Sequence, residues 1–306
     1  MYMGNKSFWS EKKILLTGGN GFLGRHIKNA LVCHDCQITA PTRDECDFTD
    51  LIGTKKMLSR DNFDIVIHAA IDCGDLNAQT ATPARIFYNN LTMNSNLFDS
   101  SYKAGVKKFV GFGSYWAYPT ALQKPLKENE YLDGELEDVS KVNGMIKRML
   151  YVNGWAYKKE YNFNSIHLIL PNIYGKNQKT RNVVSALVDK FKQAKSNNEN
   201  FVRVWGDGSS VRDFLYIDDA VSAILLAIEK YDDAEPLNIG TGIATSIKEL
   251  VKNIIIANSF SGEIIWEKDK PNGIAYRVLK TDKMKKVLNY TPATSLEEGI
   301  NIVSSC

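Results

Sequence analysis

The sequence lacks several features that mark specialised classes of protein. Its 306 residues contain no run approaching the roughly 20 apolar residues that a membrane-spanning helix requires. The net charge is only +3, which is too small and too dispersed to favour nucleic acid as a partner. Residues 1–12 are polar and lack the apolar core of a secretion signal. These absences predict a soluble cytoplasmic protein that binds neither nucleic acid nor membrane.

Cysteine and histidine are also scarce. The five cysteines are an odd number in a long chain without a secretion signal, which favours reduced thiols. Cys33 and Cys36 form a C-x-x-C pair, but no second ligand pair accompanies them, and we interpret them as ordinary thiols near a buried strand. The four histidines have no metal-ligand spacing, so we predict no metal site and expect these side chains in the core.

The first half of the chain alternates between strand and helix. Apolar runs predict parallel strands buried on both faces, at Lys13–Thr17, Gln37–Ala40, Ile65–Ala70, Lys108–Phe112 and Ser165–Leu170. Helical segments lie between them, at Phe22–Val32, Leu51–Leu58, Pro83–Ala104 and Lys141–Tyr161. This alternation is typical of an α/β fold with a doubly wound parallel sheet.

The regular alternation of strand and helix ends after Pro171, where helix and strand signals are more widely spaced. We therefore divide the chain into a domain of residues 1–171 and a smaller C-terminal α/β lobe of residues 172–306 that binds the substrate. Some segments of the second part are expected to return to the first.

A glycine-rich loop joins the first strand to the first helix. Gly18, Gly21 and Gly24 stand at G-x-x-G-x-x-G spacing. The first permits a tight turn, the second lets the backbone approach a diphosphate, and the third lets helix and strand pack closely. The amides of Phe22 and Leu23 open the helix and would face the phosphates. This context predicts a Rossmann-type domain that binds NAD(H) or NADP(H).

The residues after the second strand bear on the choice between the two cofactors. Arg43 can pair with a 2′-phosphate, which favours NADP(H). Asp44 and Glu45 keep NAD(H) open, because a carboxylate there can bind the ribose hydroxyls. Asp47 can accept a hydrogen bond from the adenine amino group.

Five segments carry a resemblance to a known family: TGGNGFLG, IVIHAA, GFGSYWAYP, PNIYG and VWGDGSSVRDFLYIDDAV. Together they resemble the NAD-dependent epimerase/dehydratase family of extended short-chain dehydrogenases, and within it the branch of the GDP-fucose synthases. The similarity covers nearly the whole chain. It implies a nucleoside diphosphate sugar, with GDP favoured, as substrate, and a homodimer that pairs two long helices of each subunit, residues 83–104 and 141–161.

The resemblance also implies site residues. Ser114 and Lys147 match the catalytic serine and lysine of the family, and Lys147 would also bind the nicotinamide ribose. Five further residues would lie beside the cofactor: Ala69, Ala70, Pro171, Asn172 and Ile173. The substrate would be bound by Ser114, Tyr115, Trp116, Asn172, Asn182, Val183, Leu187, Lys190, Trp205 and Arg212.

One departure from the family changes the expected chemistry. Asn143 occupies the position of the tyrosine that acts as general acid and base. An amide can hold a keto oxygen by a hydrogen bond, but it cannot donate a proton to it at neutral pH. The proton would then come from Ser114, Tyr115, Tyr118, water or a neighbouring hydroxyl of the substrate.

Two more departures concern the epimerase reactions of the branch. Trp116 and Asn182 stand where a cysteine and a histidine move protons at C3 and C5, and neither can act as an acid or base. We therefore expect an NADP(H)-dependent reductase acting at C4 of a GDP-linked 4-keto sugar, without epimerisation. Two alternatives stay open: a C4 dehydrogenase or 4-epimerase that retains NAD, and a catalytically impaired subunit that binds the cofactor.

Overall fold

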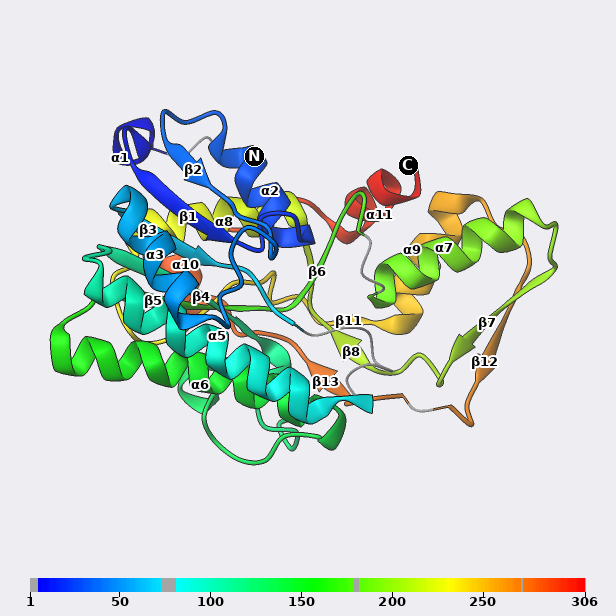
Figure 1. Cartoon of the computed structure of the whole chain (residues 1–306). Coiled ribbons are helices and arrows are strands. Elements are labelled where there is room, and N and C mark those ends of the chain that lie inside the picture. The colour runs from blue at the N-terminus through cyan, green and yellow to red at the C-terminus, as the bar shows by residue number, and fades with distance from the viewer. Residues whose placement is uncertain (1–4, 73–80, 179–181, 271, 306) are drawn as a thin grey trace.

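The computed structural model describes residues 5–72, 81–178, 182–270 and 272–305. Its centre is a six-stranded sheet in which every pairing between neighbours is parallel, in the order β2-β1-β3-β4-β5-β10 (Figure 1). The strands are β1 (Lys13–Thr17), β2 (Gln37–Thr39), β3 (Ile65–His68), β4 (Lys108–Ser114), β5 (Ser165–Leu170) and β10 (Leu237–Asn238).

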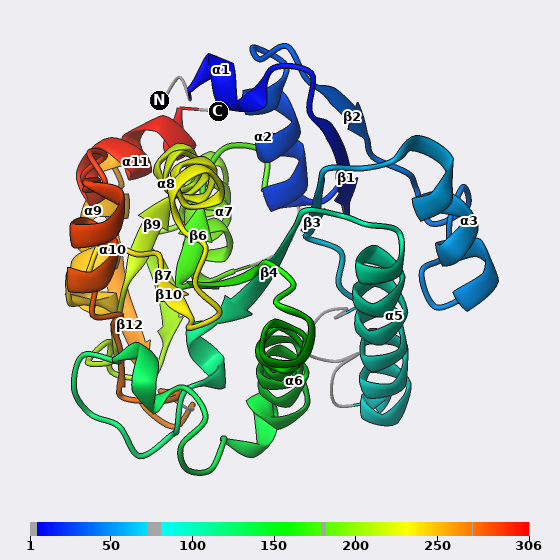
Figure 2. The same cartoon turned by 90° about the vertical axis from the view of Figure 1, so that its left-hand side faces the viewer.

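Helices cover both faces of this sheet. One face carries α3 (Leu51–Asp61), α5 (Pro83–Lys103) and α6 (Asp138–Tyr161), and the other carries α2 (Phe22–Leu31) and α8 (Ile217–Lys230). Figure 2 shows α5 and α6 side by side on one side of the strands, with α2 and α8 on the other. Successive strand residues alternate between the two cores, since Leu15 packs with the first group of helices and Ile14 and Leu16 with the second.

The order of the strands creates a switch point beside β1. The chain passes from β1 to β2 on one side and then returns to β3 on the other. In open sheets of this kind, ligands bind in the crevice at the carboxyl ends of the strands where the order reverses. The glycine loop follows β1 at that point, so the fold places it where a dinucleotide is expected.

The C-terminal part is built from shorter elements. Figure 1 shows α7, α9, β7 and β12 grouped on the side of the molecule away from the six-stranded sheet. The elements that extend from the sheet are β6 (Asn172–Tyr174), α7 (Val183–Ser196), β7 (Phe201–Trp205), β8 (Val211–Arg212), β9 (Phe214–Tyr216), β11 (Thr245–Ser246), α9 (Ile247–Asn258), β12 (Glu263–Glu267), β13 (Tyr276–Arg277) and α11 (Leu296–Ser304).

Short strand pairs organise this part. They are β7 with β12 and β6 with β9, while β8 lies between β11 and β13. The remaining elements are α1 (Lys6–Trp9), the 3-10 turns η1 (Tyr115–Ala117) and η2 (Glu128–Glu130), and α10 (Asp282–Leu288).

The predicted α/β class with a doubly wound parallel sheet is confirmed. The strands expected from apolar runs all form, and α6 begins at Asp138, one turn before the predicted Lys141. The chain returns to the sheet after the lobe, because β10 pairs with β5 and α8 packs on α2. The boundary at residue 171 stays a prediction. Within the described ranges, no helix combines the length and apolar character needed to cross a membrane.

Candidate active site

The glycine loop is shaped by close approaches that only glycine allows. Gly18 has a φ of +68°, and a Cβ atom there would lie 2.6 Å from the backbone nitrogen of Ala70 and 2.7 Å from the carbonyl carbon of Ala69. A Cβ atom at Gly24 would lie 2.2 Å from the carbonyl oxygen of Gly18. The loop therefore lies directly against the end of β3, and α2 lies directly against the loop.

The second glycine of the motif is the least crowded of the three. Gly21 is the N-cap of α2 and has no side chain to occupy the amides of the first turn. Within 4 Å, an added Cβ atom would meet only the carbonyl oxygen of Gly18, at 3.1 Å. The N–H groups that open a helix have no partner inside it and carry its positive dipole end. The loop, with Phe22 and Leu23 behind it, therefore fits the diphosphate of a dinucleotide.

The loop after β2 holds its candidate residues in a small network. Arg43 Nε lies 3.1 Å from Asp47 Oδ2, and 64% of the Arg43 side chain is exposed. Asp47 Oδ1 accepts hydrogen bonds from the backbone and hydroxyl of Thr49, at 2.9 and 2.7 Å. The guanidinium is thus held by Asp47 yet open to an incoming anion, while both Asp47 oxygens already have partners.

The loop after β4 and the helix α6 meet at a second close approach. A Cβ atom at Gly144 would lie 3.4 Å from the carbonyl oxygen of Trp116 and 2.6 Å from Leu136 Cδ1. Asn143 and Lys147, four residues apart, share one face of α6 and are half-buried beside that contact. The structure therefore brings both to the turn η1 that follows Ser114.

Ser114 caps that turn, because its Oγ accepts the backbone N–H of Trp116 at 3.3 Å. A buried arginine of α6 that the sequence analysis missed holds the turn from the other side. Arg148 Nε donates to the carbonyl of Ala117 at 2.8 Å, and its Nη2 donates to the carbonyl of Asp133 at 2.8 Å. The position of Ser114 is thus fixed by the packing of α6 as well as by the sheet.

The two tyrosines after Ser114 are buried. The Tyr118 hydroxyl donates to Asn238 Oδ1 at 2.7 Å, and the Asn238 amide in turn donates to the carbonyls of Leu126 and Lys280. Burial raises the pKa of Tyr118 and of Tyr115. The Tyr118 proton is therefore engaged in a structural bond to β10, which makes Tyr118 a poor source for the reaction.

The segment after β5 connects the six-stranded sheet to the C-terminal lobe. Pro171 follows β5, and Asn172 and Ile173 form β6, where the backbone N–H of Asn172 donates to the carbonyl of Asp213 at 3.3 Å. The Asn182 side chain caps α7 through a bond from the Ser185 N–H at 2.9 Å. Its amide nitrogen also donates to the carbonyl of Ile173 at 2.9 Å. The Asn182 amide is thus used to join α7 to β6.

Four further candidates lie on α7 and β7. Val183 is half-buried, Leu187 is buried, and Lys190 donates to the carbonyl of Arg203. Trp205 ends β7 with 64% of its surface exposed, as a stacking side chain for a base requires. A hollow of about 200 Å³ lies beside this strand and is lined by Lys190, Ala194, Glu199, Phe201, Val202, Arg203 and Glu267.

Two buried arginines stand side by side on β8 and β13. Arg212 and Arg277 are neighbours in the parallel register, with 6% and 0% of their surfaces exposed. Burial and the charge of Arg212 lower the pKa of Arg277 to about 10. Neither guanidinium forms an ion pair with a carboxylate of the described residues. Buried charge of one sign without a counter-ion is unfavourable, so this pair is suited to an anion.

The two arginines use their side chains differently. Arg277 Nη2 donates to the carbonyl of Pro119 at 3.2 Å and its Nη1 to that of Tyr276 at 3.2 Å, so it holds the loop after η1. The Arg212 guanidinium lies over the Trp116 ring, with its Cζ 5.5 Å from the ring centroid. Arg212 therefore joins the lobe to the loop that carries Ser114. Arg212 was predicted from the sequence as a binding residue, whereas Arg277, which belongs to the two-residue strand β13, was not.

Comparisons with known proteins agree with this arrangement. The model of the NAD dependent epimerase/dehydratase family matches residues 14–240. A GDP-L-fucose synthase of Sinorhizobium fredii is 31% identical over 293 residues, which cover 94% of this chain and 93% of that protein. GDP-L-fucose synthase 1 of Arabidopsis thaliana is 30% identical over 294 residues, covering 94% of this chain and 91% of the relative.

Solved structures are similar over the same extent. A GDP-mannoheptose C4 reductase from Campylobacter jejuni with NADP bound is 28% identical, has a TM-score of 0.87, and matches 96% of this chain and 98% of its own. A GDP-6-OMe-4-keto-L-xylo-heptose reductase from C. jejuni is 26% identical with a TM-score of 0.87, over 96% and 97% of the two chains. The predicted extended short-chain dehydrogenase is confirmed, and the chain belongs to the NAD dependent epimerase/dehydratase family.

Proposed function

We propose that the protein is an NADP(H)-dependent reductase that acts at C4 of a GDP-linked 4-keto sugar. The observation that carries this proposal is the position of Arg212, a buried cation without a carboxylate partner among the described residues, against Trp116. A diphosphate bound by Arg212 would place the attached sugar beside the loop of Ser114. Two similar structures support the same reaction, because one is named a C4 reductase of a GDP-linked heptose and the other a reductase of a GDP-linked 4-keto heptose.

The residues of the site have separable roles in this proposal. Bound NADPH supplies the hydride. The Ser114 hydroxyl and the Asn143 amide hold the keto oxygen, because both can donate a hydrogen bond to it. The Lys147 ammonium stabilises the negative charge that develops on that oxygen during reduction. Arg212 binds the diphosphate, since its planar fork matches phosphate oxygens.

We also propose that the enzyme does not epimerise the sugar. The Trp116 indole cannot act as an acid or base near neutral pH, and its ring lies under the Arg212 guanidinium. Asn182 is neutral, and its amide is engaged at the start of α7. Neither residue can remove a proton from C3 or C5.

The test of this function is NADPH oxidation by the purified protein with GDP-4-keto-6-deoxymannose in deuterium oxide. We expect steady oxidation, and a product without deuterium at C3 and C5. Deuterium at either carbon would contradict the absence of epimerisation. Tightly bound NAD with interconversion of 4-epimers would favour the NAD-retaining alternative, and cofactor binding without any turnover would favour an impaired subunit.

Arg43 is proposed to select NADP(H). Its exposed guanidinium is held at the end of β2 by Asp47 and can pair with a 2′-phosphate. An Arg43→Ala variant is expected to bind NADPH about tenfold more weakly or worse, because a charge-assisted pair contributes roughly 1.5–3 kcal/mol. Calorimetry with NADPH and NADH measures this, and Arg60→Ala, which removes another exposed arginine, is the control. Equal losses for both cofactors would argue against the assignment.

The homodimer is proposed to form through α5 and α6. Met145, Val152 and Trp155 are exposed apolar residues at spacings of seven and three along α6, and Tyr88 of α5 is 67% exposed. A Trp155→Glu variant is expected to shift the protein from dimer to monomer in sedimentation, because it places a charge in an apolar contact. Ile256→Glu, on the distant helix α9, is the control and should leave the mass unchanged. A wild-type monomer would refute the proposal.

A further inference from the structure

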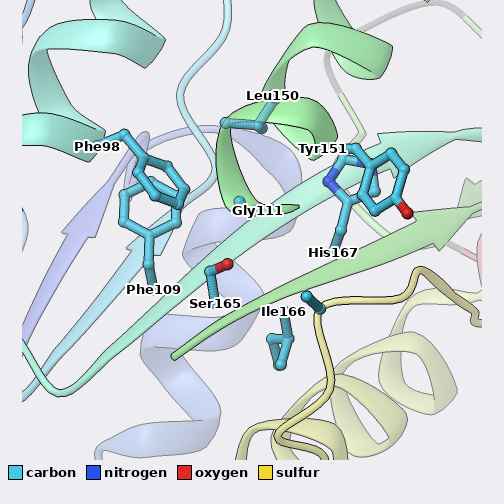
Figure 3. Close-up of a pocket in the computed structure, with 10 residues that line it drawn as sticks. Phe98, Phe109, Gly111, Leu150, Tyr151, Ser165, Ile166 and His167 are labelled. Atoms are coloured by element: carbon cyan, nitrogen blue, oxygen red, sulfur yellow. The ribbon is translucent and has the colours of Figure 1, made fainter. Parts of the chain in front are cut away.

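Two hollows in the described residues differ in what they can hold. Figure 3 shows the first, which lies between α6 and the strands β4 and β5 and is lined largely by apolar and aromatic side chains. Its volume of about 10 Å³ is at the lower limit for a single water. The second is the hollow of about 200 Å³ beside β7. Four of its seven lining residues are charged, which suits a polar ligand: Lys190, Glu199, Arg203 and Glu267.

One carboxylate at this hollow is unused. The half-buried Glu267 side chain accepts no hydrogen bond and forms no ion pair with any residue that the structure describes. The two cations at the hollow are turned to other groups. Lys190 donates to the carbonyl of Arg203, and the Arg203 guanidinium lies over the Phe201 ring, with its Cζ 5.3 Å from the centroid. Glu267 can therefore accept hydrogen bonds from a ligand.

Glu267 stands beside Trp205 on the outer face of the pair of strands β7 and β12. The two residues are partners in the parallel register, and neighbouring strands lie about 4.8 Å apart. Val204 of β7 is buried in the core, and Trp266 of β12 packs against it. Because side chains alternate along a strand, Trp205 and Glu267 both point to the opposite face. A ring stacked on Trp205 would therefore have one edge beside the Glu267 carboxylate.

This end of β7 lies close to the proposed diphosphate site. Asp207, two residues after Trp205, donates its backbone N–H to Asn272 Oδ1 at 2.8 Å. The next residue, Gly273, lies against Arg212, since a Cβ atom there would be 3.4 Å from Arg212 Nη2. Two residues of chain span at most about 7 Å. Figure 1 shows the chain running from β7 and β12 back toward β8 and β13. A base on Trp205 and a diphosphate on Arg212 can thus belong to one nucleotide.

The base that matches this edge best is guanine. Guanine presents two adjacent donors on its Watson–Crick edge, N1–H and the 2-amino group, and one carboxylate can accept both. Adenine presents a donor beside an acceptor. Uracil presents an N–H between two carbonyl oxygens, which a carboxylate repels. The aromatic face of Trp205, by contrast, stacks on any base. Selectivity between bases must therefore come from Glu267.

We propose that Glu267 makes the site selective for guanine, by accepting hydrogen bonds from N1–H and the 2-amino group of a base stacked on Trp205. The proposal rests on the GDP-linked substrate proposed above, and it names the residue that selects the base. It predicts an order of affinities. GDP should bind most tightly, inosine diphosphate, which lacks the 2-amino group, should be next, and ADP and UDP should be weakest.

Calorimetry of the purified protein with these four diphosphates tests the selection without turnover. Glu267→Gln is expected to bind GDP at least about tenfold more weakly, as the loss of a charge-assisted hydrogen bond implies. Its affinity for ADP should be unchanged or higher, because a glutamine amide offers both the acceptor and the donor that adenine requires. Trp205→Leu should weaken all four diphosphates by a similar factor, roughly tenfold, since stacking does not distinguish bases.

The matched control is Glu263→Gln, which changes a glutamate on the same face of β12, four residues earlier, and should leave all four affinities unchanged. Glu267→Gln should unfold in urea as wild type does, because the Glu267 side chain holds no other described residue. Wild type that bound GDP, ADP and UDP equally would overturn the proposal. So would a Glu267→Gln variant that kept the wild-type preference for GDP. Selection of GDP by Glu267 in a protein that never oxidises NADPH with a GDP-4-keto sugar would support the base site and refute the reductase function.

Discussion

An Arg212→Met variant is expected to bind a GDP-sugar roughly 30-fold more weakly or worse, while its free energy of unfolding stays equal or rises. The loss of affinity follows because truncating a buried, hydrogen-bonded charge pair costs about 2–5 kcal/mol. The gain in stability follows because Arg212 and Arg277 are buried beside each other without a carboxylate partner among the described residues. Replacing buried charges by apolar side chains is often neutral or stabilising, by about 1–4 kcal/mol.

The neighbouring arginine provides a matched control. Arg277→Met also removes one buried charge, but it leaves the carbonyls of both Pro119 and Tyr276 without their donor, whereas Arg212 donates to the carbonyl of its neighbour Val211. A buried carbonyl that loses its partner costs about 1–3 kcal/mol, so this variant should unfold more easily than wild type. Calorimetry with GDP-mannose and urea denaturation measure both properties. If Arg212→Met bound GDP-mannose as wild type does, the assignment of the diphosphate site would be wrong.

These two arginines also show the limit of reading a site from the sequence. Arg212 could be predicted from the sequence because the VRDFLYIDD segment resembles a family motif. Its relation to Arg277 depends on the pairing of β8 with β13, two strands of two residues each. A strand that short has no periodicity to detect, and 64 residues of chain separate the two arginines.

Five of the six strands of the central sheet, by contrast, followed from local patterns. β3 and β5 are buried along their whole length, so each appears in the sequence as a continuous apolar run. The glycine loop could also be predicted from the sequence, because a tight turn and close packing restrict those positions to glycine whatever the surroundings. The roles given to individual site residues stay predictions.

The row of His68, Gly111 and His167 could be predicted only in part. Each residue sits in a predicted strand, and each histidine was expected in the core, where both are found. What the sequence did not reveal is that the register sets them on the same face, on either side of a glycine. Register between non-adjacent segments is a property of the folded sheet, so it becomes visible only there.

The second large effect is expected at the glycine loop, where Gly18 can be compared with another glycine of similar positive φ, Gly105 after α5. Gly18 and Gly105 have φ values of +68° and +76°. A Cβ atom at Gly105 would meet nothing within 4 Å, whereas one at Gly18 would lie 2.6 Å from the Ala70 nitrogen. Alanine at either position carries the same left-handed strain, about 1–2 kcal/mol. Only Gly18→Ala also forces the loop away from the end of β3.

Gly18→Ala should therefore lose a further 1–3 kcal/mol or so of unfolding free energy through overpacking, and with it the position of the loop. We expect that saturating NADPH no longer protects this variant against thermal unfolding. Wild type and Gly105→Ala should each gain about 2.7 kcal/mol when NADPH is at 100 times its Kd, since binding to the native state shifts unfolding by mass action. Equal protection of Gly18→Ala would mean that the dinucleotide does not rest on this loop, and the hydride donor would have to be sought elsewhere in the fold.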